Sequence, residues 1–185
     1  MPSVAAARRL LRTAGFRVAK HRVFEANWLL DTARGTLARA GCLLRIRDAG
    51  GVGFLTYKGP AAPGKYKNRE ELEVEIADPR VLGVLLARLG FRTTLRYDKY
   101  RTEYRRSREA GVATLDETPI GVYLELEGTP TWIDRSARRL GFRESAYITA
   151  SYFSLYADYC RERGLPLGDM VFSRRSTLRS PARRR

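Results

Sequence analysis

The sequence predicts an α+β protein with an antiparallel sheet of about seven strands and two or three helices. Several segments alternate apolar and charged residues, and this period of two sends neighbouring side chains to opposite faces of a strand. Short glycine-containing turns separate some of these segments, as at residues 48–51, and such turns join antiparallel strands. The clearest alternating segments are residues 43–47, 71–76, 99–101 and 124–127.

The elements can be placed in order along the chain. Ser3 is the expected N-cap of the first helix, and Gly15 marks its end. Asp78 and Pro79 have the residue types of an N-cap and a first helical position, so a helix is expected from there to about Leu89. Other helices are expected at 132–140 and 151–163, with a helical turn at 36–40. Strands are expected at 16–30, 42–47, 53–58, 70–76, 91–97, 99–105, 112–116 and 124–127.

Two of the expected helices end on the same residue types. Gly90-Phe91 follows the helix that starts at Asp78, and Gly141-Phe142 follows the helix at 132–140. Glycine with an apolar residue behind it is the usual end of an α-helix, because glycine adopts the left-handed conformation of the cap. We interpret the repeated Gly-Phe pair as a helix cap that is used more than once, and not as a sign of an internal sequence repeat.

The length of 185 residues fits one domain with a substantial core. We expect the folded domain to cover residues 1–160. Residues 161–185 contain eight arginines and two acidic residues, a net charge of +6 out of +15 for the chain. They hold little that could be buried, so we expect a basic, disordered tail. A charge this far from zero favours an anionic partner.

Several classes of protein are disfavoured. No apolar run approaches the roughly 18 residues of a membrane span, and arginines interrupt the N-terminal segment where a signal peptide would be apolar. We therefore expect no membrane association and a cytoplasmic location. Cys42 and Cys160 are isolated, which favours a reduced chain. His21 is the only histidine, which argues against a structural zinc site.

The charged faces of the strands are sorted by sign, which is unusual for a solvated face. Like charges opposite each other destabilise a sheet, and such clusters persist when a multivalent anion lies between them. On a single strand, a solvated polar face would be the ordinary interpretation. Taken together, the strands favour a shared interior that binds a polyphosphate. The basic set is Arg45, Arg47, Lys58, Lys99 and Arg101.

Acidic rows alternate with the basic ones, and carboxylates would repel a phosphate unless a divalent cation lay between them. This combination predicts Mg²⁺ or Mn²⁺, bound by carboxylates and by phosphate oxygens. The predicted substrate is a nucleoside or inorganic triphosphate. The first candidates for metal ligands are Asp116, Glu125 and Glu127, and the second are Glu71, Glu73 and Glu75.

Several spaced motifs, in order, resemble the CYTH proteins, or triphosphate tunnel metalloenzymes. This family includes class IV adenylate cyclases, thiamine triphosphatases and inorganic triphosphatases. The resemblance implies an eight-stranded antiparallel β-barrel, open as a tunnel, that binds triphosphate and a divalent metal. It also adds Arg69 to the basic residues that would bind the triphosphate. The matching segments are residues 44–47, 55–60, 69–73, 99–104, 115–116, 121–128 and 151–155.

The chain departs from the family at its start. The family begins with an acidic strand of the pattern Glu-x-Glu-x-Lys, and no such segment precedes Ser3 here. We expect either a start codon placed too late or a true absence of the strand, which would leave seven strands. True absence would leave an unpaired sheet edge and fewer metal ligands.

Two hypotheses for function remain open. The first is a metal-dependent enzyme that cyclises ATP, as class IV adenylate cyclases do, or hydrolyses the terminal phosphate of a triphosphate. The second is a catalytically degenerate relative that binds polyphosphate, nucleotide or RNA. A homodimer is compatible with either. The basic tail could contact nucleic acid, but no aromatic residue follows Phe172 to stack on bases, so we do not favour this.

Overall fold

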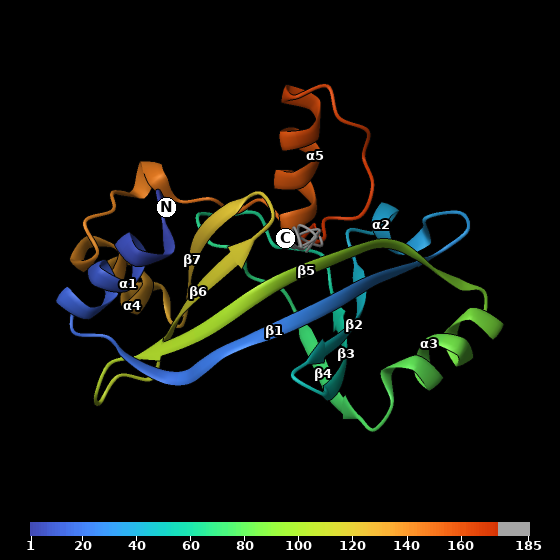
Figure 1. The fold of residues 1–185 in the computed structure, drawn as a ribbon, viewed down its shortest axis with the longest axis horizontal. Coiled ribbons are helices and arrows are strands. Elements are labelled where there is room, and N and C mark those ends of the chain that lie inside the picture. Colours follow the sequence, from blue (N-terminus) through green and yellow to red (C-terminus); the bar gives the residue numbers. More distant parts are fainter. Residues whose placement is uncertain (174–185) are drawn as a thin grey trace, which may run out of the picture.

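The computed structural model of the chain describes residues 1–173 and is built around one long curved sheet (Figure 1). The helices are α1 (Val4–Thr13), α2 (Thr36–Arg39), α3 (Pro79–Arg88), α4 (Pro130–Arg139) and α5 (Tyr152–Glu162), with a 3₁₀ turn η1 (Glu144–Ala146). The strands are β1 (Arg17–Thr32), β2 (Leu43–Ala49), β3 (Val52–Lys58), β4 (Glu71–Ile76), β5 (Phe91–Arg105), β6 (Val112–Thr118) and β7 (Gly121–Glu127).

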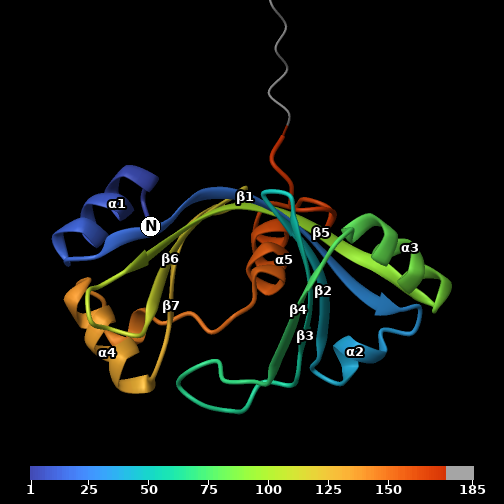
Figure 2. The same cartoon turned by 90° about the horizontal axis from the view of Figure 1, so that it is seen from below.

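The seven strands form a single antiparallel sheet in the order β4-β3-β2-β1-β5-β6-β7. This confirms the predicted fold class in its seven-stranded form. The sheet curves strongly, and α5 stands within the curve (Figure 2). Within residues 1–173, β4 and β7 each pair with one neighbour only, so the curved sheet has two edges instead of closing on itself.

The two longest strands form the middle of the sheet and run through both of its lobes. Their pairing extends from Arg17 opposite Arg105 to Thr32 opposite Phe91, with three register irregularities. The sequence predicted two strands, at 91–97 and 99–105, where the structure has the single strand β5. Asp98 interrupts the apolar pattern but continues the backbone pairing opposite Ala26.

Helices cover the outer face of the sheet at both ends. At one end α1 and α4 pack over β6 and β7, and Phe16 meets Trp132 edge-on with ring centroids 6.3 Å apart. At the other end Leu86 of α3 packs with Leu30 and Ile46. Apolar residues of the strands therefore face these helices, and the charged residues between them are left for the concave side.

The helix ends confirm the predicted glycine caps. Gly15, Gly90 and Gly141 all have φ between 80° and 91°, which is the left-handed region. After α1 the Phe16 N–H donates to the carbonyl of Leu11 at 2.9 Å. The equivalent bond after α4 has the same length. The similar Gly-Phe pairs in the sequence thus reflect the same cap geometry at the ends of these helices.

The structure places residues 161–173, the first part of the predicted tail, against the folded domain. Helix α5 continues to Glu162, and Met170 is buried. Met170 bridges to Tyr97 on β5, at a stretch of that strand's edge that β6 does not reach, and the Asp98 N–H donates to the Met170 carbonyl at 2.9 Å. Residues 174–185, the rest of the predicted tail, lie outside the described residues. No helix among residues 1–173 is long and apolar enough to cross a membrane.

Candidate functional site

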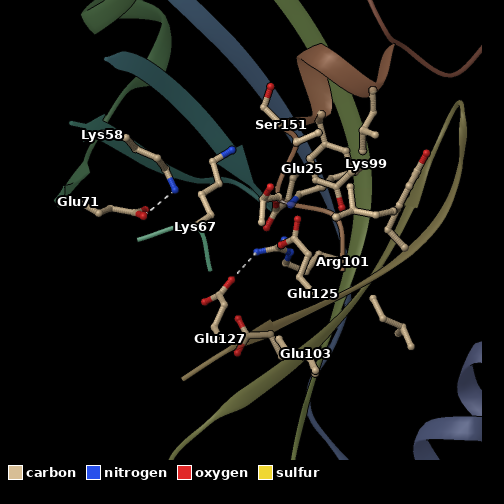
Figure 3. A pocket seen from close by; sticks show the side chains of 18 of the residues that line it. Glu25, Lys58, Lys67, Glu71, Lys99, Arg101, Glu103, Glu125, Glu127 and Ser151 are labelled. Atoms are coloured by element: carbon tan, nitrogen blue, oxygen red, sulfur yellow. Dashed lines mark hydrogen bonds and ion pairs between the residues drawn. The ribbon is translucent and has the colours of Figure 1, made fainter. Parts of the chain in front are cut away.

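The concave side of the sheet encloses a cavity of about 1070 Å³ lined by charged side chains (Figure 3). The alternation of each strand places every second side chain on this side. All six residues predicted to bind triphosphate line the cavity: Arg45, Arg47, Lys58, Arg69, Lys99 and Arg101. The acidic residues that line it are Glu25, Glu71, Glu73, Glu103, Glu125 and Glu127.

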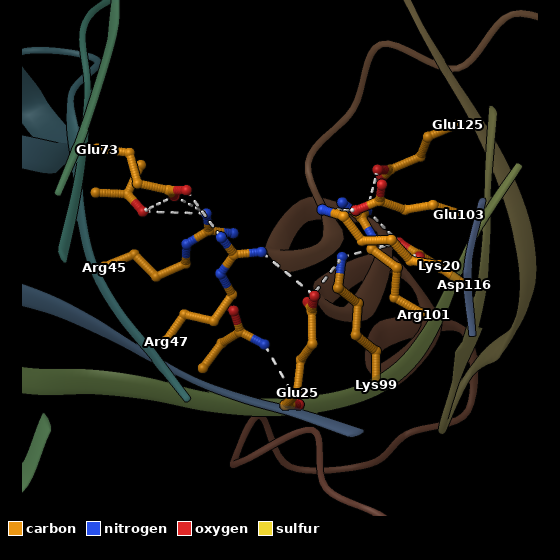
Figure 4. Close-up of polar contacts among 12 residues, drawn as sticks. Lys20, Glu25, Arg45, Arg47, Glu73, Lys99, Arg101, Glu103, Asp116 and Glu125 are labelled. Carbon is orange, nitrogen blue, oxygen red and sulfur yellow. Dashed lines mark hydrogen bonds and ion pairs between the residues drawn. The ribbon is translucent and has the colours of Figure 1, made fainter. Parts of the chain in front are cut away.

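One wall of the cavity comes from β2, β3 and β4. Glu73 accepts from Arg47 at 2.9 Å and from Arg45 at 3.4 Å, and Thr56 donates to the same carboxylate at 2.6 Å (Figure 4). Burial alone would raise the pKa of the Glu73 carboxyl, but the hydrogen bond from Thr56 and the charge of Arg47 hold that pKa below its usual value. Glu73 therefore stays ionised and fixes two guanidinium groups side by side.

The opposite wall comes from β5, β6 and β7. Asp116 accepts from Lys99 at 2.9 Å and from two nitrogens of Arg101 at 2.7 and 2.6 Å. Tyr152, the first residue of α5, donates to the same carboxylate at 2.8 Å. Arg101 also contacts Glu125 on β7. Burial alone would raise the pKa of the Asp116 carboxyl, but Lys99 and Arg101 outweigh it and hold the pKa at about 2.

A carboxylate that the sequence analysis missed connects the two walls. Glu25 on β1 accepts from Arg47 at 3.3 Å and lies 3.5 Å from Lys99 (Figure 4). It is buried, and its Oε2 has no hydrogen-bond partner among the described residues. The signal in the sequence is weak, because Glu25 is a single acid among apolar and basic residues. Its position arises from the register of β1, which puts Glu25 opposite Lys99.

Two cations of the cavity have no ion-pair partner among residues 1–173. Lys58 is paired with Glu71 at 2.7 Å, but neither Lys67 nor Arg69, from the loop that follows, lies within 4 Å of a carboxylate. Burial lowers the pKa of Lys67, and the charges of Arg69 and Lys58 lower it further. Lys67 was also missed from the sequence, since a loop has no periodicity to reveal its direction.

The predicted metal ligands fall into three different environments. Asp116 is completely buried and holds Lys99 and Arg101, so it acts in this structure as their partner. Glu125 and Glu127 lie on one face of β7 at the cavity, and across from them Glu71 and Glu73 lie on β4. Glu75 lies further along β4, outside the residues that line the cavity.

The donor set fits a divalent cation that is also bound by phosphate. No group of three His, Cys, Asp or Glu residues within residues 1–173 is arranged to hold a metal ion by itself. Burial raises the pKa of Glu127 against the effect of Arg101, and the neighbouring Glu125 adds to the rise. Glu125 and Glu127 are therefore two neighbouring carboxylates that share one cationic partner, Arg101. Mg²⁺ is commonly held by one or two carboxylates together with phosphate oxygens and water.

Comparison with known families identifies the class of this protein. The CYTH domain family matches residues 1–145. The match covers most of the chain, so the chain belongs to the CYTH family. The seven-stranded curved sheet with a charged interior is the structural counterpart of that match.

Individual relatives agree with this assignment. MJ0240 from Methanocaldococcus jannaschii, provisionally named an adenylate cyclase, is 40% identical over 85 residues, which are 45% of this chain and 47% of MJ0240. The matched region thus spans about half the length of that curated relative.

Solved structures have the same fold. PH1819 from Pyrococcus horikoshii OT3 has a TM-score of 0.72 at 28% identity, with 85% of this chain and 95% of that chain covered. HpAC1 from Hippeastrum has a TM-score of 0.63 at 24% identity, with coverage of 90% and 94%. HpAC1 was provisionally named an adenylyl cyclase, and its structure is described as revealing a dominant triphosphatase activity.

Proposed function

We propose that this protein is a metal-dependent enzyme that binds a nucleoside or inorganic triphosphate in the cavity and transfers or releases a phosphoryl group. The observation that carries the proposal is a pair of cationic side chains on each side of a carboxylate-bridged cavity, Arg45 with Arg47 and Lys99 with Arg101. Two further cationic side chains of the cavity, Lys67 and Arg69, have no ion-pair partner among residues 1–173. A triphosphate carries about four negative charges at neutral pH and needs donors from several directions. The provisional cyclase name of MJ0240 and the triphosphatase description of HpAC1 support the same substrate class.

The basic residues would act by positioning and by electrostatic stabilisation, which is most of what phosphoryl transfer requires. Arg45 and Arg47 would face one side of the phosphate chain, and Lys99 and Arg101 the other. Glu73 and Asp116 hold these groups in place before substrate arrives. Less reorganisation is then needed when charge develops on the phosphate oxygens.

Two reactions are compatible with this arrangement. In hydrolysis, water attacks the γ-phosphorus and the terminal phosphate leaves. In cyclisation, the 3′-hydroxyl of ATP attacks the α-phosphorus and pyrophosphate leaves. The same cations would neutralise the phosphates in both cases, so the products decide between a hydrolase and a lyase.

Mg²⁺ or Mn²⁺ is part of the proposal. A divalent cation supplies charge neutralisation and orientation of the phosphate oxygens. Glu125 and Glu127 would be its ligands from this chain, with Glu71 and Glu73 near enough to the cavity to take part. Asp116 would serve as the partner that orients Lys99 and Arg101.

The test is an activity assay with product analysis. The protein is incubated with tripolyphosphate, ATP or thiamine triphosphate, each with Mg²⁺ or Mn²⁺, and phosphate, pyrophosphate and cyclic AMP are measured. Phosphate release indicates a triphosphatase, and cyclic AMP with pyrophosphate indicates a cyclase. Activity lost in Arg45→Ala but kept in Arg92→Ala, an exposed arginine outside the cavity, would locate the reaction.

A second candidate is binding without turnover. It is favoured by the extent to which the cations are already paired, because Arg45, Arg47, Lys99 and Arg101 all contact carboxylates. Tight binding of tripolyphosphate with no product over hours would support it. Formation of a homodimer and location in the cytoplasm are also part of the proposal for this protein. Any role for the basic residues 174–185 lies outside the described part of the chain.

A further inference from the structure

The loop of residues 59–70, between β3 and β4, forms a short projection with a defined base. The Gly59 N–H donates to the Glu70 carbonyl at 3.0 Å, and the Ala62 N–H donates to the Asn68 carbonyl at 2.8 Å. The tip of the loop, residues 63–67, extends away from β4 toward α4 (Figure 2). Because β4 is one edge of the sheet and α4 follows the other edge strand, the loop crosses the open side of the cavity.

Side chains fasten this tip to the far side. Lys65 donates to Asp134 of α4 at 2.9 Å and lies 2.9 Å from Glu144 of η1. The Tyr147 hydroxyl donates to the other oxygen of Asp134 at 2.9 Å. The ammonium group of Lys65 also lies 5.7 Å from the centre of the Tyr147 ring. Four polar groups on three segments thus meet where the tip of the loop contacts α4 and η1.

The loop carries two cations into the cavity. Lys67 is the last residue of the tip, and Arg69 lies between Asn68 and Glu70, whose carbonyls accept the two hydrogen bonds at the base of the loop. Both line the cavity, and neither has an ion-pair partner within 4 Å among residues 1–173. Figure 3 shows Lys67 beside Lys58 and Glu71. Two unpaired cations held close to Lys58 and Arg45 repel these neighbours. An arrangement of this kind is stabilised when an anion occupies the space between them.

We propose that Lys67 is a phosphate-binding residue, and that the contacts of Lys65 with Asp134 and Glu144 form a latch that holds Lys67 over the cavity. Lys65, Asp134 and Glu144 are positioning residues in this scheme. The inference rests on the proposed function, since it names a further contact for the same triphosphate. It adds an opening step, because a latch made of partly exposed ion pairs is weak enough to release and reform.

Trypsin cleavage sites within the loop can show whether the loop opens. Trypsin cleaves after lysine and arginine, and Lys65, Lys67 and Arg69 are all in or beside the fastened segment. The double variant Asp134→Ala/Glu144→Ala removes the latch and leaves every one of these cleavage sites in place. We expect cleavage in the loop to become about three- to tenfold faster, in line with two weak ion pairs. Magnesium tripolyphosphate should slow the same cleavage in the wild-type protein.

The control is Asp158→Ala, which removes another exposed carboxylate paired with an arginine, Arg161 of α5. It should leave loop cleavage unchanged. Circular dichroism and thermal unfolding of each variant establish that cleavage reports the loop and not global unfolding. Equal cleavage rates in the latch variant and the wild type would overturn the latch.

The role of Lys67 is tested by calorimetric titration with magnesium tripolyphosphate. We expect Lys67→Ala to weaken binding about tenfold or more, and Lys67→Arg to restore most of it, because arginine keeps the charge. If the wild type binds and Lys67→Ala binds equally well, Lys67 is not a phosphate-binding residue while the proposed function stands. If the wild type binds no triphosphate, both are overturned.

Discussion

Lys99 and Asp116 form an ion pair that is enclosed by protein. Their Nζ and Oδ2 atoms are 2.9 Å apart, and the side chains are 2% and 0% exposed. A charge removed from water in this way needs a partner of opposite sign. The Asp116 carboxylate also accepts hydrogen bonds from Arg101 of β5 and from Tyr152 of α5. This one carboxylate therefore fixes β5 and the start of α5 relative to each other.

Asp116→Asn should destabilise the fold and change its response to acid. Loss of the buried charge leaves Lys99 and Arg101 poorly compensated, and we expect a loss of about 3 kcal/mol in urea unfolding at pH 7. The Asp116 pKa is about 2 in the folded protein, below its usual value of 3.8. The stabilisation is therefore complete above about pH 5 and is lost as the pH falls toward 2.

The pH dependence of the free energy of unfolding is the more specific test of this prediction. Unfolding free energies of the wild type and of Asp116→Asn should differ most between pH 5 and 7 and should converge as the pH approaches about 2. Asp158→Asn, at an exposed position on α5, provides the comparison for a surface charge. A difference that stays constant over this pH range would contradict the assigned role of Asp116.

Arg101→Lys should impair triphosphate binding although the charge is kept. Arg101 makes two parallel hydrogen bonds to Asp116 and contacts Glu125, and a lysine ammonium cannot reproduce this planar geometry. We expect the dissociation constant for magnesium tripolyphosphate to rise about 10- to 100-fold in calorimetric titration. Arg105→Lys, four residues further along β5 and exposed, should bind as the wild type does.

Gly111→Ala should destabilise the lobe that contains α1 and α4. A Cβ at Gly111 would lie 2.2 Å from the ring of Trp132 on α4, which is itself buried in the apolar cluster of this lobe. We expect a loss of about 1–3 kcal/mol in urea unfolding followed by tryptophan fluorescence. Gly168→Ala meets no atom within 4 Å and should leave stability unchanged. An equal effect of both substitutions would show that the close approach of Trp132 is unimportant.

The regular elements were predictable because their period is visible in one segment at a time. Arg45 and Arg47 alternate with Leu44 and Ile46, and this alone places both arginines on one face of β2. The caps of α1, α3 and α4 were readable for the same reason, since a cap depends on a few adjacent residues. Five basic residues of the candidate site, Arg45, Arg47, Lys58, Lys99 and Arg101, followed from such local patterns, whereas Arg69 came from the family resemblance.

The residues that escaped prediction depend on contacts between distant segments. Glu25 gains its role only through the register of β1 with β2 and β5, which sets it between Arg47 and Lys99. Lys67 points into the cavity because Lys65 is fastened to Asp134, 69 positions away in the sequence. Met170 is ordered by a free stretch of the β5 edge. Composition alone had suggested disorder there.

Glu125 and Glu127 should be required for binding of a divalent cation together with triphosphate. The two carboxylates lie near each other on β7, and burial together with this neighbour raises the pKa of Glu127. A divalent cation would relieve the repulsion and displace any proton held there. We expect Glu125→Gln/Glu127→Gln to weaken Mn²⁺ binding about tenfold or more in the presence of tripolyphosphate, measured from the electron paramagnetic resonance signal of free Mn²⁺. Glu75→Gln removes a carboxylate from β4 that does not line the cavity and should bind Mn²⁺ normally. If the β7 variant retains wild-type Mn²⁺ binding while Arg101→Lys loses triphosphate, the cavity binds phosphate through its cations and the metal ligands lie elsewhere.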